Sequence, residues 1–84
     1  MDATFLFGHS VWIGDNEVGY ISPLHDGNAA IYIHNRKFAF LGGNGQIGIN
    51  GKAVGHIEES GDIIMNDKVV GEITPQDDIR FYEV

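Results

Sequence analysis

The sequence predicts an all-β domain: a closed ring, or shallow barrel, of five β-hairpins with pseudo-five-fold symmetry. Two observations lead to this prediction. Four segments of the chain align with one another without gaps, and each has the strand–turn–strand pattern of a hairpin. No window shows the apolar spacing of three and four residues that an amphipathic helix would show over three turns. At 84 residues the chain has room for one domain, residues 1–84.

The four aligned segments each place a two-residue turn between two runs of β-branched and aromatic residues. They are VWIGDNEVGYI (11–21), IYIHNRKFAFL (31–41), IGINGKAVGHI (47–57) and IIMNDKVVGEI (63–73). The residues at the bends are Gly14-Asp15, His34-Asn35, Asn50-Gly51 and Asn66-Asp67. Asn-Gly is the strongest hairpin signal, because both central residues of a type I′ turn need positive φ. A leading Gly suits a type II′ turn, and Asn, Asp and His tolerate the left-handed region.

The spacing of the segments predicts that the ring closes through the two ends of the chain. Equivalent positions recur every 16 residues, except that one four-residue insertion lies within 22–28. Continuing the count places the first strand of a fifth hairpin at 79–84, and counting backwards places its second strand at 2–5. Such closure would remove the exposed edge strands that otherwise invite aggregation.

Four positions of the repeat are apolar in nearly every segment, and we expect their side chains to form the core. These are Val11, Ile31, Ile47, Ile63 and Ile79; Ile13, Ile33, Ile49, Met65 and Phe81; Val18, Phe38, Val54 and Val70; and Phe5, Ile21, Leu41, Ile57 and Ile73. Burying such side chains contributes about 1.5–3 kcal/mol each before chain entropy is subtracted.

A small residue separates the last two apolar positions and predicts a kink in every hairpin. The residues are Gly19, Ala39, Gly55, Gly71 and Ala3. Val18 and Ile21 are three residues apart, so strict alternation would send them to opposite faces of the sheet. A β-bulge beside the small residue would return both to the same face.

These hairpin segments resemble the small bacterial β-flower proteins, in a five-petal version. The resemblance rests on WIGDNEVGYI, YIHNRKFAFL, GINGKAVGHI and IMNDKVVGEI and covers essentially the whole chain. It implies a shallow, pseudo-symmetric barrel of hairpin petals around an apolar centre, and it implies no catalytic residues. The second petal departs from the pattern, with Ala39 in place of Gly and HNRK (34–37) at its tip.

Charge and composition narrow the range of partners. The formal net charge is −7, from five Lys and Arg against twelve Asp and Glu. This charge repels nucleic acid and anionic membrane surfaces, so we expect no nucleic-acid partner. No segment is apolar over the length of a membrane span, and the N-terminus lacks the pattern of a signal peptide. We therefore expect no membrane insertion and a cytoplasmic protein.

Positions that differ between the hairpins are the ones free for function. At two such positions the first two hairpins carry aromatic residues and the other segments carry none: Trp12, Tyr20, Tyr32 and Phe40. The insertion with His25 joins the same two hairpins. Because Trp and Tyr are enriched at contact sites, we expect a single site here that binds a small molecule or a protein. Two alternatives stay open: a homo-oligomer whose aromatic face is the subunit interface, and aromatic residues that only pack the sheet.

Catalysis and metal binding have weaker support in the sequence. The histidines, His9, His25, His34 and His56, show no metal-ligand spacing, and the chain contains no Cys. No nucleophile motif or phosphate-binding loop is present. The sequence therefore predicts a non-enzymatic protein without a metal or cofactor. A small hydrolase using His25 or His56 is the remaining alternative.

Overall fold

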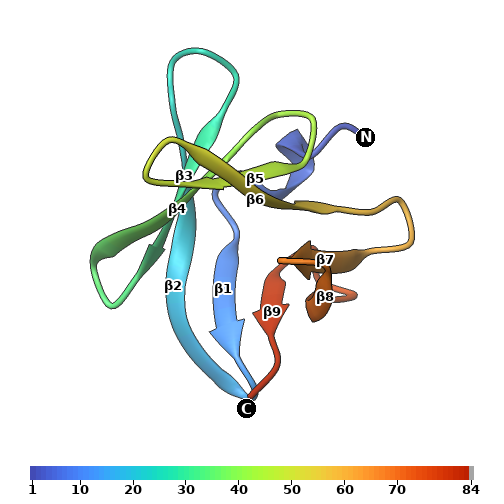
Figure 1. The fold of residues 1–84 in the computed structure, drawn as a ribbon. Helices are drawn as coiled ribbons and strands as arrows, with labels where there is room; N and C mark the ends of the chain where they lie inside the picture. Colours follow the sequence, from blue (N-terminus) through green and yellow to red (C-terminus); the bar gives the residue numbers. More distant parts are fainter. Residues whose placement is uncertain (84) are drawn as a thin grey trace.

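The structure, a computed structural model, describes residues 1–83, which form a closed barrel of nine strands (Figure 1). The strands are β1 (Ser10–Ile13), β2 (Asn16–Pro23), β3 (Ala29–Ile33), β4 (Arg36–Leu41), β5 (Gln46–Ile49), β6 (Lys52–Ile57), β7 (Asp62–Met65), β8 (Lys68–Ile73) and β9 (Ile79–Phe81). A short 3₁₀ helix, η1 (Thr4–Leu6), precedes them. The all-β class and the closure of the sheet are confirmed. Val84, the end of the predicted strand 79–84, lies outside the described residues.

The first eight strands pair as four antiparallel hairpins, β1–β2, β3–β4, β5–β6 and β7–β8. Their tips are the four predicted two-residue turns. Three of these turns have positive φ at both central residues, for example 52° at Asn66 and 65° at Asp67, as a type I′ turn requires. In the first turn Gly14 has a φ of 57°, which agrees with the type II′ turn expected from a leading Gly.

A β-bulge interrupts each of the four hairpins, as the sequence predicted. In β1–β2, Val11 pairs with Gly19 while Trp12 pairs with Glu17, so Val18 is the extra residue. The same register shift occurs in the other three hairpins, immediately before Ala39, Gly55 and Gly71. The bulge turns Val18, Val54 and Val70 toward the core, against which they pack, whereas Phe38 is more exposed.

The barrel closes through a parallel pairing, and the prediction of a fifth hairpin built from both chain ends is wrong in its N-terminal half. β9 pairs antiparallel with β8 and parallel with β1, where Gly14 also donates its N–H to the carbonyl of Phe81 over 2.9 Å. The predicted strand 2–5 does not form, and Thr4 and Phe5 belong to η1. Asp2 causes this local change, because its Oδ1 accepts hydrogen bonds from the N–H and hydroxyl of Thr4 (2.9 and 2.6 Å).

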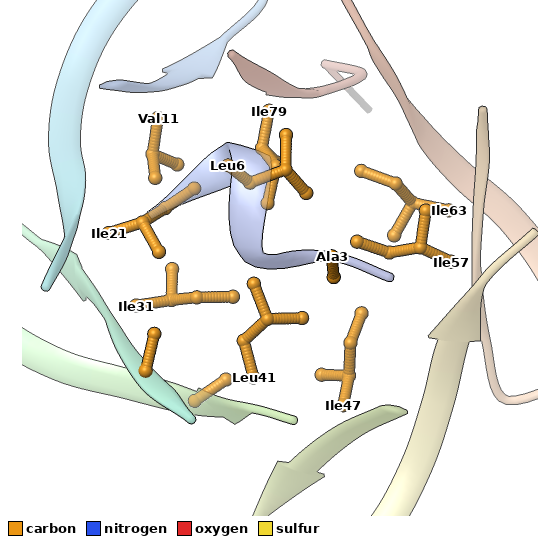
Figure 2. Packing of buried hydrophobic residues seen from close by; sticks show 12 residues of the cluster. Ala3, Leu6, Val11, Ile21, Ile31, Leu41, Ile47, Ile57, Ile63 and Ile79 are labelled. Atoms are coloured by element: carbon orange, nitrogen blue, oxygen red, sulfur yellow. The ribbon is translucent and has the colours of Figure 1, made fainter. Parts of the chain in front are cut away.

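Instead of adding a strand, the N-terminal segment plugs the barrel. Figure 2 shows η1 inside the ring of buried side chains, with Ala3 and Leu6 among them, and both are fully buried. Backbone hydrogen bonds hold the segment at both ends, from Ala3 to Gly43 (2.8 Å) and from Gly8 to Ile21 (2.6 Å). The plug fills an axial space that the short inward side chains of the strands leave open.

The predicted core is largely correct, with a gradient of burial along the barrel axis. The first apolar position is buried in all five places, and Ile21, Leu41 and Ile57 are buried beside it. The two positions nearest the turns are mostly half-buried and pack against this core. Two residues depart: Phe5 is 43% exposed, because Leu6 takes its place, and Phe38 is 38% exposed.

The four-residue insertion lengthens strands and does not enlarge a loop. β2 and β3 remain paired as far as Pro23 and Ala29, beyond the Ile21–Ile31 pair. The remaining loop is closed by a hydrogen bond from the N–H of Leu24 to the carbonyl of Asn28 (2.7 Å), and Gly42 bonds Gln46 in the same way (2.8 Å). His25 therefore lies on an exposed loop at the end of an extended ladder.

Glycine in the small-residue position lets the next hairpin approach closely. A Cβ added at Gly19, Gly55 or Gly71 would overlap a carbonyl oxygen of the neighbouring strand. Each of these glycines pairs with that strand, as Gly55 does with Met65. Ala39 has a Cβ, and there the pairing between β4 and β5 is limited to Phe40 with Gly48 and Leu41 with Ile47. The Ala39 methyl group thus holds β5 away from β4.

Replacing Gly by Ala after a bulge should loosen the junction between hairpins, and replacing Ala39 by Gly should tighten it. Gly55→Ala should lower the free energy of unfolding by about 1–3 kcal/mol, because the new methyl group forces β7 away from β6. Ala39→Gly should change it by less than about 1 kcal/mol, since the gain in pairing offsets the added chain entropy. Urea unfolding measures both values. Equal stability losses in the two variants would contradict this account.

Candidate functional site

A groove lies between the tips of two hairpins, β3–β4 and β5–β6, which both lie on the left in Figure 1. Its volume is about 620 Å³. From β4 it is lined by Lys37, Phe38 and Phe40, and from the β5–β6 hairpin by residues including Ile49 and Lys52. Size and mixed lining are typical of a small-molecule site, for which volumes of about 300–1,000 Å³ are usual.

The groove opens where the strand pairing between hairpins is interrupted. At the β6–β7 junction, for example, the first residue of the turn, Asn66, donates its N–H to the carbonyl of the bulge residue Val54 over 3.0 Å. His34 and Tyr82 make the equivalent bonds at two other junctions (both 2.9 Å). Between Asn50 and Phe38 no such bond forms within residues 1–83. The separated backbones leave room for the groove.

Gly48 deepens the groove because it has no side chain. Its position in the repeat is occupied elsewhere by Trp12, Tyr32, Ile64 and Arg80. A Cβ at Gly48 would lie 3.9 Å from the Cβ of Phe40 and 3.3 Å from the carbonyl oxygen of Lys52. The Phe40 side chain and the Lys52 backbone therefore stand on either side of an unfilled position.

The structure brings together two of the five predicted site residues. Tyr20 on β2 and Tyr32 on β3 are paired across strands and stacked, with ring centroids 5.1 Å apart and an interplanar angle of 9°. Phe40 lines the groove. Trp12 lies on β1, toward β9, and His25 lies on the exposed loop beyond the β2–β3 ladder. The five residues thus spread along the outside of hairpins one and two.

Trp12 is held by a polar cluster that the sequence analysis missed. Its indole N–H donates to Asp78 Oδ2 over 3.0 Å, while Asp78 Oδ1 accepts from the N–H of Ser10 (3.1 Å) and lies 3.4 Å from Nδ1 of His9. Partial burial works against the ionised form of Asp78, but the hydrogen bonds from Trp12 and Ser10 and the nearby His9 outweigh it and lower its pKa. The carboxylate ties the β8–β9 loop to β1 beside the parallel closure.

Ser10, His9 and Asp78 are close in space, but their contacts are not those of a catalytic triad. The Ser10 hydroxyl donates to a carboxylate oxygen of Glu17 and makes no hydrogen bond to His9 among the described residues. His9 therefore has no activated nucleophile as its partner. The cluster serves to join the first and last strands.

The two histidines of the hydrolase hypothesis, His25 and His56, make no hydrogen bond to a nucleophile within the described part of the chain either. His25 is exposed on its loop, and His56, exposed on β6, approaches only a surface carboxylate, with Nε2 3.8 Å from Glu58 Oε2. Within residues 1–83 no group of three or more His, Asp or Glu side chains is arranged to hold a metal ion.

The sequence analysis did not predict the groove, because its residues are marked in the sequence only by departures from the hairpin repeat. Ala39 stands where the other three hairpins have Gly, and Gly48 has no side chain at a position where the other segments carry various large residues. Aromatic residues gave a stronger signal and directed the prediction toward hairpins one and two. Phe40 belongs to both descriptions, since it was predicted as a site residue and lines the groove.

Comparison of the chain with protein-family models, with curated proteins and with solved structures found no match. Among the described residues there is no helix with the length and apolar character needed to cross a membrane.

Asp78 should make stability depend on pH in the acidic range. Its pKa in the folded state is lower than the ordinary value of 3.8, so its contribution is complete above that value and is lost as the pH falls through the folded-state pKa. Asp78→Asn should cost about 1–3 kcal/mol near neutral pH, because charge-assisted hydrogen bonds are lost. Urea unfolding followed by Trp12 fluorescence at several pH values measures the difference.

The difference in stability between wild type and Asp78→Asn should shrink as the pH falls below the ordinary value of 3.8 and through the lower folded-state pKa, where the wild-type carboxylate takes up its proton. Asp67→Asn, in an exposed turn, removes the same charge and serves as the control. If the difference between wild type and Asp78→Asn were constant down to strongly acidic pH, the assigned role of the ionised carboxylate would be wrong.

Proposed function

We propose that this chain is a non-enzymatic binding module whose site is the groove between the β3–β4 and β5–β6 tips. The interrupted pairing at Ala39 carries this proposal. A closed barrel gains stability from continuous pairing between its hairpins, and here that pairing is shortened to two residue pairs at one junction, where a groove with aromatic residues in its lining lies. Local departures from an otherwise consistent pattern are typical of functional sites.

This proposal moves the binding site by one hairpin from the place that the aromatic residues suggested. Phe40 remains in the site, whereas Trp12 is held by Asp78 and Tyr20 stacks on Tyr32. Binding by Trp12, Tyr20, Tyr32 and His25 stays a prediction. The resemblance to five-petal β-flower proteins also stays a proposal, which the four bulged hairpins support and the missing N-terminal strand weakens.

Filling the groove should abolish binding without unfolding the protein. Gly48→Ile introduces the residue that stands at the equivalent position of β7, Ile64, and places it in the groove. The probe is a set of aromatic acids, amines and neutral heterocycles, titrated while amide shifts are followed by NMR. We expect at least one compound to bind with a dissociation constant of about 0.1–1 mM and to shift residues 37–53.

In Gly48→Ile these shifts should disappear, while circular dichroism and the melting temperature stay close to those of wild type. His56→Ile is the matched control, because it adds the same side chain at an exposed strand position outside the groove. If Gly48→Ile does not fold, Phe40→Ala provides a second test, with an expected affinity loss of about tenfold, or ~1.4 kcal/mol. The absence of any compound that shifts residues 37–53 would contradict the proposal.

A second candidate, self-association, is favoured by the exposed aromatic pair. Tyr20 is 44% exposed although it stacks on Tyr32, and exposed Tyr rings are common in subunit interfaces. Light scattering measures the mass of the protein in solution. Under this hypothesis the mass is a multiple of 9.2 kDa, and Tyr20→Ser returns it to that of one chain.

Val69→Ser, an equally polar change at an exposed position of β8, is the control for self-association and should leave the mass unchanged. A mass of one chain for the wild type at all accessible concentrations would argue against this candidate.

A further inference from the structure

The groove differs in charge from the rest of the molecule. Two of the five basic residues of the chain, Lys37 and Lys52, line it, and none of the twelve acidic residues does. The two lysines belong to the two hairpins that border the groove, since Lys37 lies on β4 and Lys52 begins β6. In a chain of net charge −7, this is a local positive site.

Neither ammonium group is neutralised by a neighbouring carboxylate. Ion pairs do occur elsewhere, for example between Arg80 Nη1 and Glu72 Oε2 at 3.3 Å. Among residues 1–83, however, no ion pair includes Lys37 or Lys52. Both side chains are exposed, and they remain available to an anion from solution.

Much of the remaining lining is apolar, beside the polar residues Gln46 and Asn50. Phe38 and Phe40 on β4 and Ile49 on β5 line the groove, and the missing side chain of Gly48 leaves a space next to Phe40. Flat apolar bodies pack well against such aromatic rings. The groove therefore combines an apolar space with two cations at its sides.

Two other hollows on the surface lack this combination. One, of about 510 Å³, is lined by apolar residues that include Phe38 and Phe81 but also by Glu83. The other, of about 540 Å³, is lined by residues that include Glu58 and Glu59, the latter paired with the N-terminal amino group at 3.5 Å. Carboxylates at both places would repel an anionic ligand.

We propose that the groove binds a small organic anion, with its carboxylate or sulfonate between Lys37 and Lys52 and a flat apolar body against Phe38, Phe40 and Ile49. This inference rests on the proposed binding function of the same groove and adds the chemical class of its ligand. The volume of about 620 Å³ fits a molecule of one to three fused or linked rings. The charge of the lining, opposite to that of the whole chain, selects the anion.

The test uses two dyes with the same ring system and different charge: 1-anilinonaphthalene-8-sulfonate, which is anionic, and N-phenyl-1-naphthylamine, which is neutral. Fluorescence titration gives the affinity, and amide shifts in NMR locate the dye. The anionic dye should bind one per chain and shift residues 37–53, with an affinity about tenfold higher than that of the neutral dye.

Single variants distinguish the contribution of the lysine charges to dye affinity from that of apolar packing. Lys37→Gln and Lys52→Gln should each weaken the anionic dye about two- to fivefold and leave the neutral dye unchanged, as expected for partly solvated charges. Raising the salt concentration should weaken the anionic dye in wild type and less in the double variant. Lys68→Gln is the matched control, because Lys68 occupies the position equivalent to Lys52 in the next hairpin and lies outside the groove.

Each other outcome overturns part of the account. Equal affinity for both dyes, with shifts at residues 37–53, would refute the preference for anions and leave the binding function standing. If neither dye shifts those residues, the groove is not a binding site and the proposed function fails as well. Binding of an extended acidic peptide along β4, with no effect of the anionic dye, would refute the small anion and make a peptide the ligand.

Discussion

The arrangement of the hairpins depends on how closely the next strand can approach the residue that follows each β-bulge. Where that residue is Gly19, Gly55 or Gly71, the carbonyl of the next strand occupies the place of a side chain, and the hairpins pair closely. Where it is Ala39, one methyl group prevents this approach. The groove lies at this looser junction, while the junctions beside the three glycines are tight.

Closure of the barrel adds a second requirement: the space along the barrel axis, inside the ring of inward side chains, must be filled. Leu6 and Ala3 meet it from outside the sheet, on a segment that Asp2 turns away from the extended conformation. The last strand then pairs in parallel with β1, and Asp78 fixes this contact through Trp12 and Ser10. The two ends of the chain thus contribute differently, one as a plug and the other as a strand.

The same constraints explain where binding chemistry can be placed. Tight junctions cover the backbone and leave little space between hairpins, so variation there changes only the outer surface. The open junction exposes Phe40 beside Gly48 and sets Lys37 and Lys52 at its sides. A small barrel can in this way hold a ligand between two hairpins. Ala39 shortens the strand pairing there, and Gly48 leaves out a side chain.

The sequence alone determined the features that depend on neighbours along the chain. Turn residues such as Asn50-Gly51 fixed the hairpins, the apolar positions fixed the core, and the residues before Gly55 and its equivalents fixed the bulges, since each needs only local geometry. Tertiary structure alone decided the path of η1, the contact of Asp78 with Trp12 and the groove at Ala39. These depend on the space left when the barrel closes, and that space is set by distant backbones that no local pattern specifies.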